Sequence, residues 1–231
     1  KARYKKMSVN LIAIDEAHCI SQWGFDFRPS YLNIANLRKE KPDVPFIALT
    51  ATATPKVVID IQKQLKFKKE NALQKSFVRK NLAYAVLNEE DKKTRVLKIL
   101  KSVPGTSVVY VRSRRKTKEI ALFLQKNGIA SDFYHAGLSN EERTLKQSNW
   151  INNFTRVIVS TNAFGMGIDK PDVRSVIHVD LPDSLEAYFQ EAGRAGRDED
   201  KAYAILLFEE ADRIDLEKRI VNSFPEIDTI K

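Results

Sequence analysis

Short apolar runs alternate with amphipathic stretches along the whole chain, which is the pattern of strands that alternate with helices. Parallel strands need long crossover connections, so this order predicts an α/β fold with parallel sheets and helices on both faces. Strands buried on both faces also read as continuous apolar runs rather than alternating ones. The predicted strands are 9–14, 44–49, 82–87, 108–111, 157–159, 176–179 and 204–208.

Helix start signals support this assignment. Thr54 followed by Pro55 predicts an N-cap with proline at the first helical position. Ser139 with Glu142 three residues later predicts a capping box. Trp150 and Phe154 have helical spacing, and we expect both in the core. The predicted helices are 56–65, 115–125 and from 139 to about 152.

The charge balance changes along the chain and marks a domain boundary near residues 76–82. The 231 residues contain 39 Lys and Arg and 30 Asp and Glu, a net charge of +9. All of this excess falls in residues 1–80, which hold two convincing strands, whereas residues 81–231 are neutral and hold about six. We expect 1–80 to be part of a domain and 81–231 to be a complete one. The basic segment indicates either a polyanionic partner such as nucleic acid or a solvated, lysine-rich helix end and loop.

Composition excludes several classes of protein. A lone Cys19 excludes an intramolecular disulfide and a multi-cysteine zinc site, which favours a reducing, intracellular and cytoplasmic setting. No apolar run reaches the roughly 18 residues that a membrane span needs. We expect Cys19 to be a small packed residue rather than a nucleophile, because no basic partner is evident nearby in sequence. His178, at a strand edge, is expected to be a structural histidine.

Two adjacent carboxylates, Asp15 and Glu16, follow the strand 9–14. Ligands of parallel sheets bind at the carboxyl ends of the strands, where these side chains emerge. One carboxylate could hold Mg²⁺, through water because that ion dehydrates reluctantly, and the other could deprotonate an attacking water. The alternative is an acidic turn after a strand.

Six segments of the chain carry a family resemblance. They are DEAH (15–18), CISQWGFDFRP (19–29), TATAT (50–54), VYVRSR (109–114), STNAFGMGIDKP (160–171) and QEAGRAGR (190–197). In this order they resemble motif II, the aromatic-rich loop and motifs III to VI of RecQ-family DNA helicases. The resemblance covers the chain from residue 9 to about 208. It implies RecA-like sheets and an ATP-dependent, 3′–5′ DNA helicase of DNA repair and recombination.

The resemblance also implies a role for individual residues. It implies catalysis by Asp15 (with Mg²⁺), Glu16, His18, Gln190, Arg194 and Arg197. It implies ATP binding by Gly167 and Asp169, with the latter facing the ribose. It implies contact with single-stranded or duplex DNA, or coupling to it, by Trp23, Phe25, Phe27, Arg28, Thr50, Thr52, Arg112 and Thr161. Exposed aromatics stack on unpaired bases at roughly 1–3 kcal/mol each. The alternative for Trp23 and Phe25 is that their rings are buried in a small hydrophobic core of their own.

The glycines of motif V, Gly165 and Gly167, follow a predicted strand. They would let the backbone approach a nucleotide or a sugar-phosphate chain. A tight turn with positive φ is the other interpretation.

The glycines of motif VI, Gly193 and Gly196, alternate with Arg194 and Arg197, which are spaced for one face of a helical turn. We expect the glycines to remove side chains that would block the guanidiniums from reaching ATP bound between two domains. A guanidinium on the γ-phosphate is worth roughly 10³–10⁵ in rate. The alternative is a pair of surface arginines that form ion pairs with the acidic run 198–200.

The family's phosphate loop, G-x-x-x-x-G-K-[ST], does not occur in these 231 residues, nor do its zinc-binding and winged-helix modules. The chain therefore looks like a fragment, and we expect no ATP hydrolysis from it alone. Two alternatives stay open: an RNA helicase of the DEAD/DEAH type, and a non-catalytic nucleic-acid-binding remnant.

Overall fold

The computed structural model describes residues 2–24, 26–76, 78–165 and 168–223. The chain divides into two compact units, Lys1–Phe77 and Val78–Lys231. The functional boundary between residues 80 and 81 stays a prediction. Within the described ranges, no helix is both long and apolar enough to cross a membrane.

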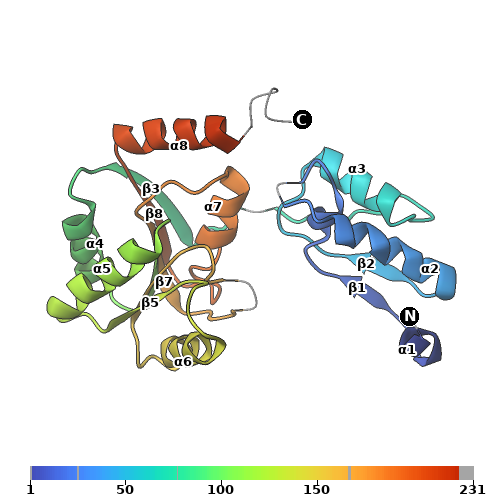
Figure 1. Ribbon diagram of the computed structural model, residues 1–231, viewed down its shortest axis with the longest axis horizontal. Coiled ribbons are helices and arrows are strands. Elements are labelled where there is room, and N and C mark those ends of the chain that lie inside the picture. The colour runs from blue at the N-terminus through green and yellow to red at the C-terminus, as the bar shows by residue number, and fades with distance from the viewer. Residues whose placement is uncertain (1, 25, 77, 166–167, 224–231) are drawn as a thin grey trace. The chain divides into compact units, whose positions relative to one another are not determined.

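The first unit contains a short parallel sheet in which β1 pairs with β2, Ile12 lying opposite Phe46 (Figure 1). Its core is formed by apolar side chains from both strands, the turn after β1 and the helix α3. Thr54 caps α3 as predicted, since its hydroxyl accepts a hydrogen bond from the Val57 N–H. The elements are α1 (Ala2–Lys6), β1 (Ile12–Ile14), the 3₁₀ helices η1 (Ala17–Ile20) and η2 (Pro29–Asn36), α2 (Leu37–Glu40), β2 (Phe46–Ala48) and α3 (Pro55–Gln64).

The second unit contains a six-stranded sheet, all parallel in its described part, with strand order β3-β8-β7-β4-β6-β5. The predicted α/β class and parallel pairing are confirmed. The predicted capping box at Ser139 and Glu142 is present in full. The elements are β3 (Leu82–Asn88), α4 (Lys92–Ser102), β4 (Thr106–Tyr110), α5 (Arg114–Lys126), β5 (Ser131–Tyr134), α6 (Asn140–Ile151), β6 (Val157–Ser160), β7 (Val173–His178), α7 (Leu185–Ala192), β8 (Ala202–Phe208) and α8 (Glu210–Ser223).

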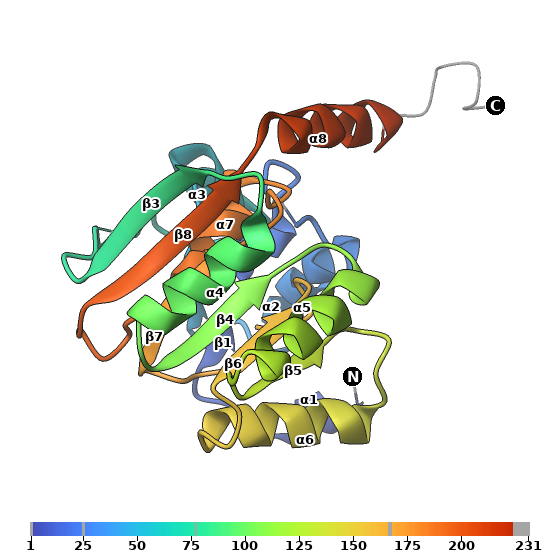
Figure 2. The same ribbon diagram turned by 90° about the vertical axis from the view of Figure 1, so that its left-hand side faces the viewer.

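Helices cover both faces of this sheet, and the alternation of side chains along β4 shows how. Val109 faces the helices α4 and α5, which lie over one face (Figure 2), while Val108 and Tyr110 face α6 and α7. Trp150 of α6 is buried, as predicted. Phe154 is 76% exposed, so its predicted place in the core is wrong. The helix ends at Ile151, and helical spacing no longer sets the direction of a side chain beyond that point.

Candidate functional site

The two motif II carboxylates lie at the carboxyl end of β1. Asp15 is exposed, and its Oδ1 accepts the Glu16 backbone N–H at 2.9 Å. Glu16 has the left-handed φ of 48°, an uncommon conformation for a residue with a side chain, and it starts the 3₁₀ helix η1. Its Oε2 lies 3.3 Å from His18 Nδ1, so the two carboxylates have different partners.

His18 is buried and joins the turn after β1 to the turn after β2. Its Nδ1 lies 2.9 Å from the Thr50 hydroxyl, and that hydroxyl also accepts the Thr52 N–H. Burial lowers the pKa of His18 despite the nearby charge of Glu16, so the imidazole is neutral at pH 7. The Thr52 hydroxyl is itself buried with no hydrogen-bond partner among the described residues. The structure thus brings predicted residues of motifs II and III into direct contact.

Cys19 is packed in the core of the first unit, as predicted, but the reason given from the sequence is wrong. A basic group is close, because His18 Nε2 lies 3.7 Å from the sulfur. Burial, followed by the charge of Asp26, nevertheless raises the pKa of the Cys19 thiol to about 11. The thiol therefore stays protonated at neutral pH and is a poor nucleophile.

In the aromatic-rich loop, Trp23 is 63% exposed, so the alternative in which its ring is buried in a small core is wrong. The Lys56 ammonium lies 3.2 Å from the centre of its ring, a cation–π contact that leaves the indole at the surface. Arg28 binds Asp26, with Nε 3.0 Å from Oδ2, and these hydrogen bonds lower the pKa of Asp26. Phe27 is half-buried, and Phe25 lies outside the described residues.

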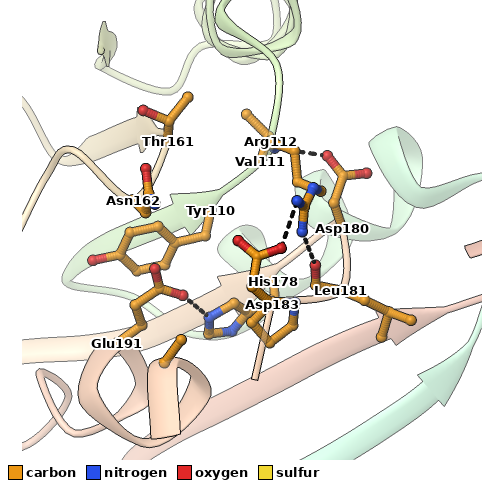
Figure 3. A pocket seen from close by; sticks show the side chains of 12 residues that line it. Tyr110, Val111, Arg112, Thr161, Asn162, His178, Asp180, Leu181, Asp183 and Glu191 are labelled. Atoms are coloured by element: carbon orange, nitrogen blue, oxygen red, sulfur yellow. Dashed lines mark hydrogen bonds and ion pairs between the residues drawn. The ribbon is translucent and has the colours of Figure 1, made fainter. Parts of the chain in front are cut away.

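A second site lies at the carboxyl ends of β4, β6 and β7 in the second unit. A cavity of about 120 Å³ opens there, and two predicted residues line it: Arg112, which is exposed, and Thr161, which is buried (Figure 3). The other lining residues were not singled out as ligands from the sequence. They are Tyr110, Val111, Asn162, His178, Asp180, Leu181, Pro182, Asp183, Ala187 and Glu191.

Acidic groups hold Arg112 in this site. Its Nη2 lies 2.6 Å from Asp183 Oδ1, its Nη1 donates to the Leu181 carbonyl, and its backbone N–H donates to Asp180 (Figure 3). Asp180 also pairs with Lys116 at 2.6 Å. The signal for these carboxylates was in the sequence, since both closely follow a predicted strand that ends at the same sheet edge.

His178 connects the cavity to α7. It is buried, its Nε2 lies 2.8 Å from Glu191 Oε2, and its ring stacks on Tyr110 with centres 5.2 Å apart (Figure 3). This agrees with the structural histidine that the sequence predicts. Glu191 adjoins Gln190, which is half-buried on the same helix.

The motif VI arginines follow the end of α7 at Ala192, so the prediction that they share one face of a helical turn is wrong. Arg194 Nη1 donates to the Gly165 carbonyl at 2.6 Å, and Arg197 Nη1 lies 2.7 Å from Asp169 Oδ1. The Arg194 Nε is buried without a hydrogen-bond partner among the residues described. Both arginines therefore contact the motif V segment.

The acidic run that follows Arg197 has another partner. Asp198 binds Arg174, and these hydrogen bonds lower the pKa of Asp198. The alternative, in which the motif VI arginines form ion pairs with this run, is therefore wrong for Asp198.

The glycines of these motifs have reasons that the sequence did not show. Gly165 does not have positive φ; instead, a Cβ there would lie 2.1 Å from the Arg194 Nη2. Gly196 has a φ of +60°, and its Cβ would lie 2.7 Å from Asn81 Nδ2. A Cβ on Gly193 would meet the Phe189 carbonyl at 2.8 Å. That Gly193 and Gly196 also clear a path for the guanidiniums toward ATP stays a prediction, and Gly167 lies outside the described residues.

Comparisons with known proteins show the family of this chain. Residues 2–61 match the model of the DEAD/DEAH box helicase family, and residues 91–199 match that of the helicase conserved C-terminal domain. RecQ-like DNA helicase blm-1 of Caenorhabditis elegans is 47% identical over 212 residues, 90% of this chain. ATP-dependent DNA helicase RecQ of Bacillus subtilis (strain 168) is 45% identical over 208 residues, 89% of this chain. The chain belongs to the RecQ family. It spans 22% and 35% of the lengths of these two relatives.

A solved structure supports the RecA-like α/β fold expected of a RecQ protein. That structure, S. cerevisiae Dbp5 bound to RNA and ADP BeF3, has a TM-score of 0.71 and 22% identity. The match covers 98% of this chain and 61% of the Dbp5 chain. At this identity the likeness concerns the fold alone.

The motif residues offer groups that suit a metal ion and an anion. Asp15 and Glu16 offer carboxylate oxygens, the donors that Mg²⁺ prefers. The buried Nε of Arg194, which has no hydrogen-bond partner among the described residues, suits an anionic acceptor such as a phosphate oxygen. The arrangement can thus bind charge at two sheet edges, one in each unit.

Proposed function

We propose that this RecQ chain is part of an ATP-dependent DNA helicase that moves 3′ to 5′ and acts in DNA repair and recombination. One observation carries the proposal: both motif VI arginines contact motif V, Arg194 through the Gly165 carbonyl and Arg197 through Asp169. These contacts gather both guanidiniums at one segment, where they can meet the phosphates of a nucleotide together. The identity of 45–47% to DNA helicases of the RecQ type supports the same conclusion.

The carboxylates of motif II have separate tasks in this proposal. Mg²⁺, when bound, neutralises charge on the phosphates, and Asp15 would hold it through water. Glu16 orients the attacking water and accepts its proton at a carboxylate oxygen. His18, neutral and hydrogen-bonded to the Thr50 hydroxyl, fixes the turn on which Glu16 stands and relays changes from motif III.

Arg197 is held by a partner that a phosphate can replace. Asp169 is 79% exposed, and an exposed ion pair of this kind contributes about 0–1 kcal/mol. Exchange of Asp169 for a triphosphate therefore costs Arg197 little. In the transition state a guanidinium on the transferring phosphoryl group is worth roughly 10³–10⁵ in rate.

DNA contact is assigned to both units. The exposed ring of Trp23 can stack on an unpaired base, with Phe25 and Phe27 as further candidates and Arg28 beside them. Arg112 and Thr161, at the edge of the second sheet, can bind the sugar-phosphate backbone once Arg112 leaves Asp183. Thr50 and Thr52 couple these contacts to motif II.

The test begins with the 231 residues themselves, from which we expect DNA binding without DNA-stimulated phosphate release. The chain is then joined behind a RecA-like segment that carries the phosphate loop of the family, G-x-x-x-x-G-K-[ST]. We expect the chimera to hydrolyse ATP in the presence of DNA. In the chimera, Glu16→Gln or Arg197→Ala should lower kcat by at least 10³ without changing the Kd for DNA. Arg213→Ala, in an exposed pair of α8, serves as the control.

Three results would count against the proposal. Phosphate release by the 231 residues alone would show that these residues need no phosphate loop. Equal activity of the Arg197→Ala chimera would remove the arginine from catalysis. Unwinding of RNA but not DNA duplexes would favour the DEAD/DEAH alternative, and salt-sensitive binding without any nucleotide response would favour a non-catalytic module.

A further inference from the structure

The segment that begins the second unit holds the loop of the motif VI arginines. Arg79 lies just after the division between the two units. Its Nη1 donates to the Gly193 carbonyl at 3.1 Å, and its Nη2 donates to the Gly196 carbonyl. These two carbonyls belong to the residues directly before Arg194 and directly before Arg197, so one guanidinium fixes the backbone at both arginines.

Asn81 holds the same loop from the other end. Its Nδ2 donates to the Gly196 carbonyl at 2.7 Å and to the Asp200 carbonyl at 2.9 Å. Its own carbonyl accepts the Ala202 N–H, where β8 begins beside β3. The Gly196 carbonyl thus receives two side-chain donors from residues more than 110 positions earlier in the chain.

The chemistry of the loop explains why these donors are needed. Gly193 is the C-cap of α7, and carbonyls at a helix C-terminus lack partners within the helix and carry partial negative charge. A planar guanidinium can satisfy two such carbonyls at once, which an ammonium cannot do with the same geometry. Gly196 has a left-handed φ, and a Cβ there would collide with Asn81, so its backbone and the Asn81 amide fit each other closely.

We propose that Arg79 and Asn81 are positioning residues for the motif VI arginines, a role that rests on the proposed function of Arg194 and Arg197. They set the backbone from which both guanidiniums extend, so that Arg194 reaches Gly165 and Arg197 reaches Asp169. Neither residue touches the nucleotide itself. In the competing interpretation, the hydrogen bonds of Arg79 and Asn81 stabilise the fold without positioning the arginine side chains.

The experiment uses the full chain and needs no hydrolysis. Arg79→Gln removes the charge and the paired N–H donors of the guanidinium. Asn81→Asp removes the amide donor and keeps the shape of the side chain. Lys80→Gln is the matched control, because Lys80 is exposed between them and makes the same change in charge. Hydrogen exchange of residues 193–200 reports the loop, and the side-chain Nε–H NMR signals of Arg194 and Arg197 report the guanidiniums.

For Arg79→Gln and Asn81→Asp we expect exchange in 193–200 to rise at least tenfold and both arginine signals to move or broaden. Arg79→Lys should restore only part of the wild-type spectrum, and Lys80→Gln should match wild type. Faster exchange with unmoved arginine signals would show that Arg79 and Asn81 only stabilise the loop, and it would overturn the proposal. Unchanged exchange would also overturn it.

A separate measurement distinguishes failure of the proposed function. In the chimera that carries the phosphate loop, binding of a fluorescent ATP analogue should weaken at least tenfold in Arg197→Ala and Arg79→Gln alike. If Arg197→Ala binds as wild type while Arg79→Gln still moves the Arg197 signal, the positioning role stands and the role of the arginine toward nucleotide fails.

Discussion

Replacement of Gly196 by Ala tests how tightly the motif VI loop is packed. The residue has a φ of +60°, and the added Cβ would lie 2.7 Å from Asn81 Nδ2 and 2.8 Å from both the Ala202 Cβ and the Asp200 carbonyl oxygen. None of these atoms is the end of a free, flexible side chain, because two hydrogen bonds hold the Asn81 amide. The loop must therefore deform.

The expected loss of unfolding free energy has two parts. A left-handed backbone costs an L-residue roughly 1–2 kcal/mol, and overpacking costs about 1–3 kcal/mol. We therefore expect Gly196→Ala to lower the unfolding free energy by about 2–5 kcal/mol. Gly128 is the matched control, since it has a φ of +80° but nothing within 4 Å of its Cβ position. Gly128→Ala should show the backbone part alone.

The assay uses the chain's two tryptophans, one in each unit. In a Trp23→Phe background, fluorescence of the buried Trp150 reports the second unit during urea unfolding. The difference between the two glycine variants gives the steric part directly. Equal losses for Gly196→Ala and Gly128→Ala, or a larger loss for Gly128→Ala, would refute the close fit at Gly196.

Three further outcomes are expected. Gly165→Ala should displace the flexible end of Arg194 and weaken binding of an ATP analogue. The unfolding free energy of the second unit, measured in urea, should fall by no more than roughly 1 kcal/mol, and a larger loss would contradict this expectation. Because the pKa of Cys19 is raised to about 11, roughly 10⁻³ of the thiol is ionised at about pH 8. Native Cys19 should therefore react with iodoacetamide at least a hundredfold more slowly than in urea, and comparable rates would be inconsistent with its burial. The Arg174 hydrogen bonds lower the pKa of Asp198, so this pair stabilises the folded state above the ordinary Asp pKa and is lost as pH falls through the folded value. Urea midpoints between about pH 5 and pH 2 should fall less steeply in Asp198→Asn than in wild type, and parallel curves would argue against the pair.

Local patterns in the sequence were sufficient for most elements of the fold. The caps at Thr54 and Ser139 were predictable because each depends on a side chain and a backbone N–H three residues later. The first strand was predicted over 9–14 but spans Ile12–Ile14. Its described partner β2 offers only three residues for pairing, and an apolar run does not show how long the neighbouring strand is.

The site was predictable where motifs lie beside strand ends, and not where distant segments meet. Asp15 and Thr161 follow strands, so topology alone places them at sheet edges. The bond from Arg79 to the Gly193 carbonyl joins residues 114 positions apart, and nothing local marks Arg79 as its donor. The reason for Gly165 likewise depends on Arg194, which approaches from another segment.

The pairing of β3 with β8 has a consequence for synthesis on the ribosome. Among the described strands, β3 pairs with β8 alone, and Leu82 lies opposite Ala202, so this neighbour of β3 is made 120 residues later. At about 5–20 residues per second, that wait lasts roughly 6–24 s. During this time the backbone groups of β3 stay unpaired and Leu82, which is buried in the folded chain, stays exposed, so the nascent strand can pair with other chains unless a chaperone covers it.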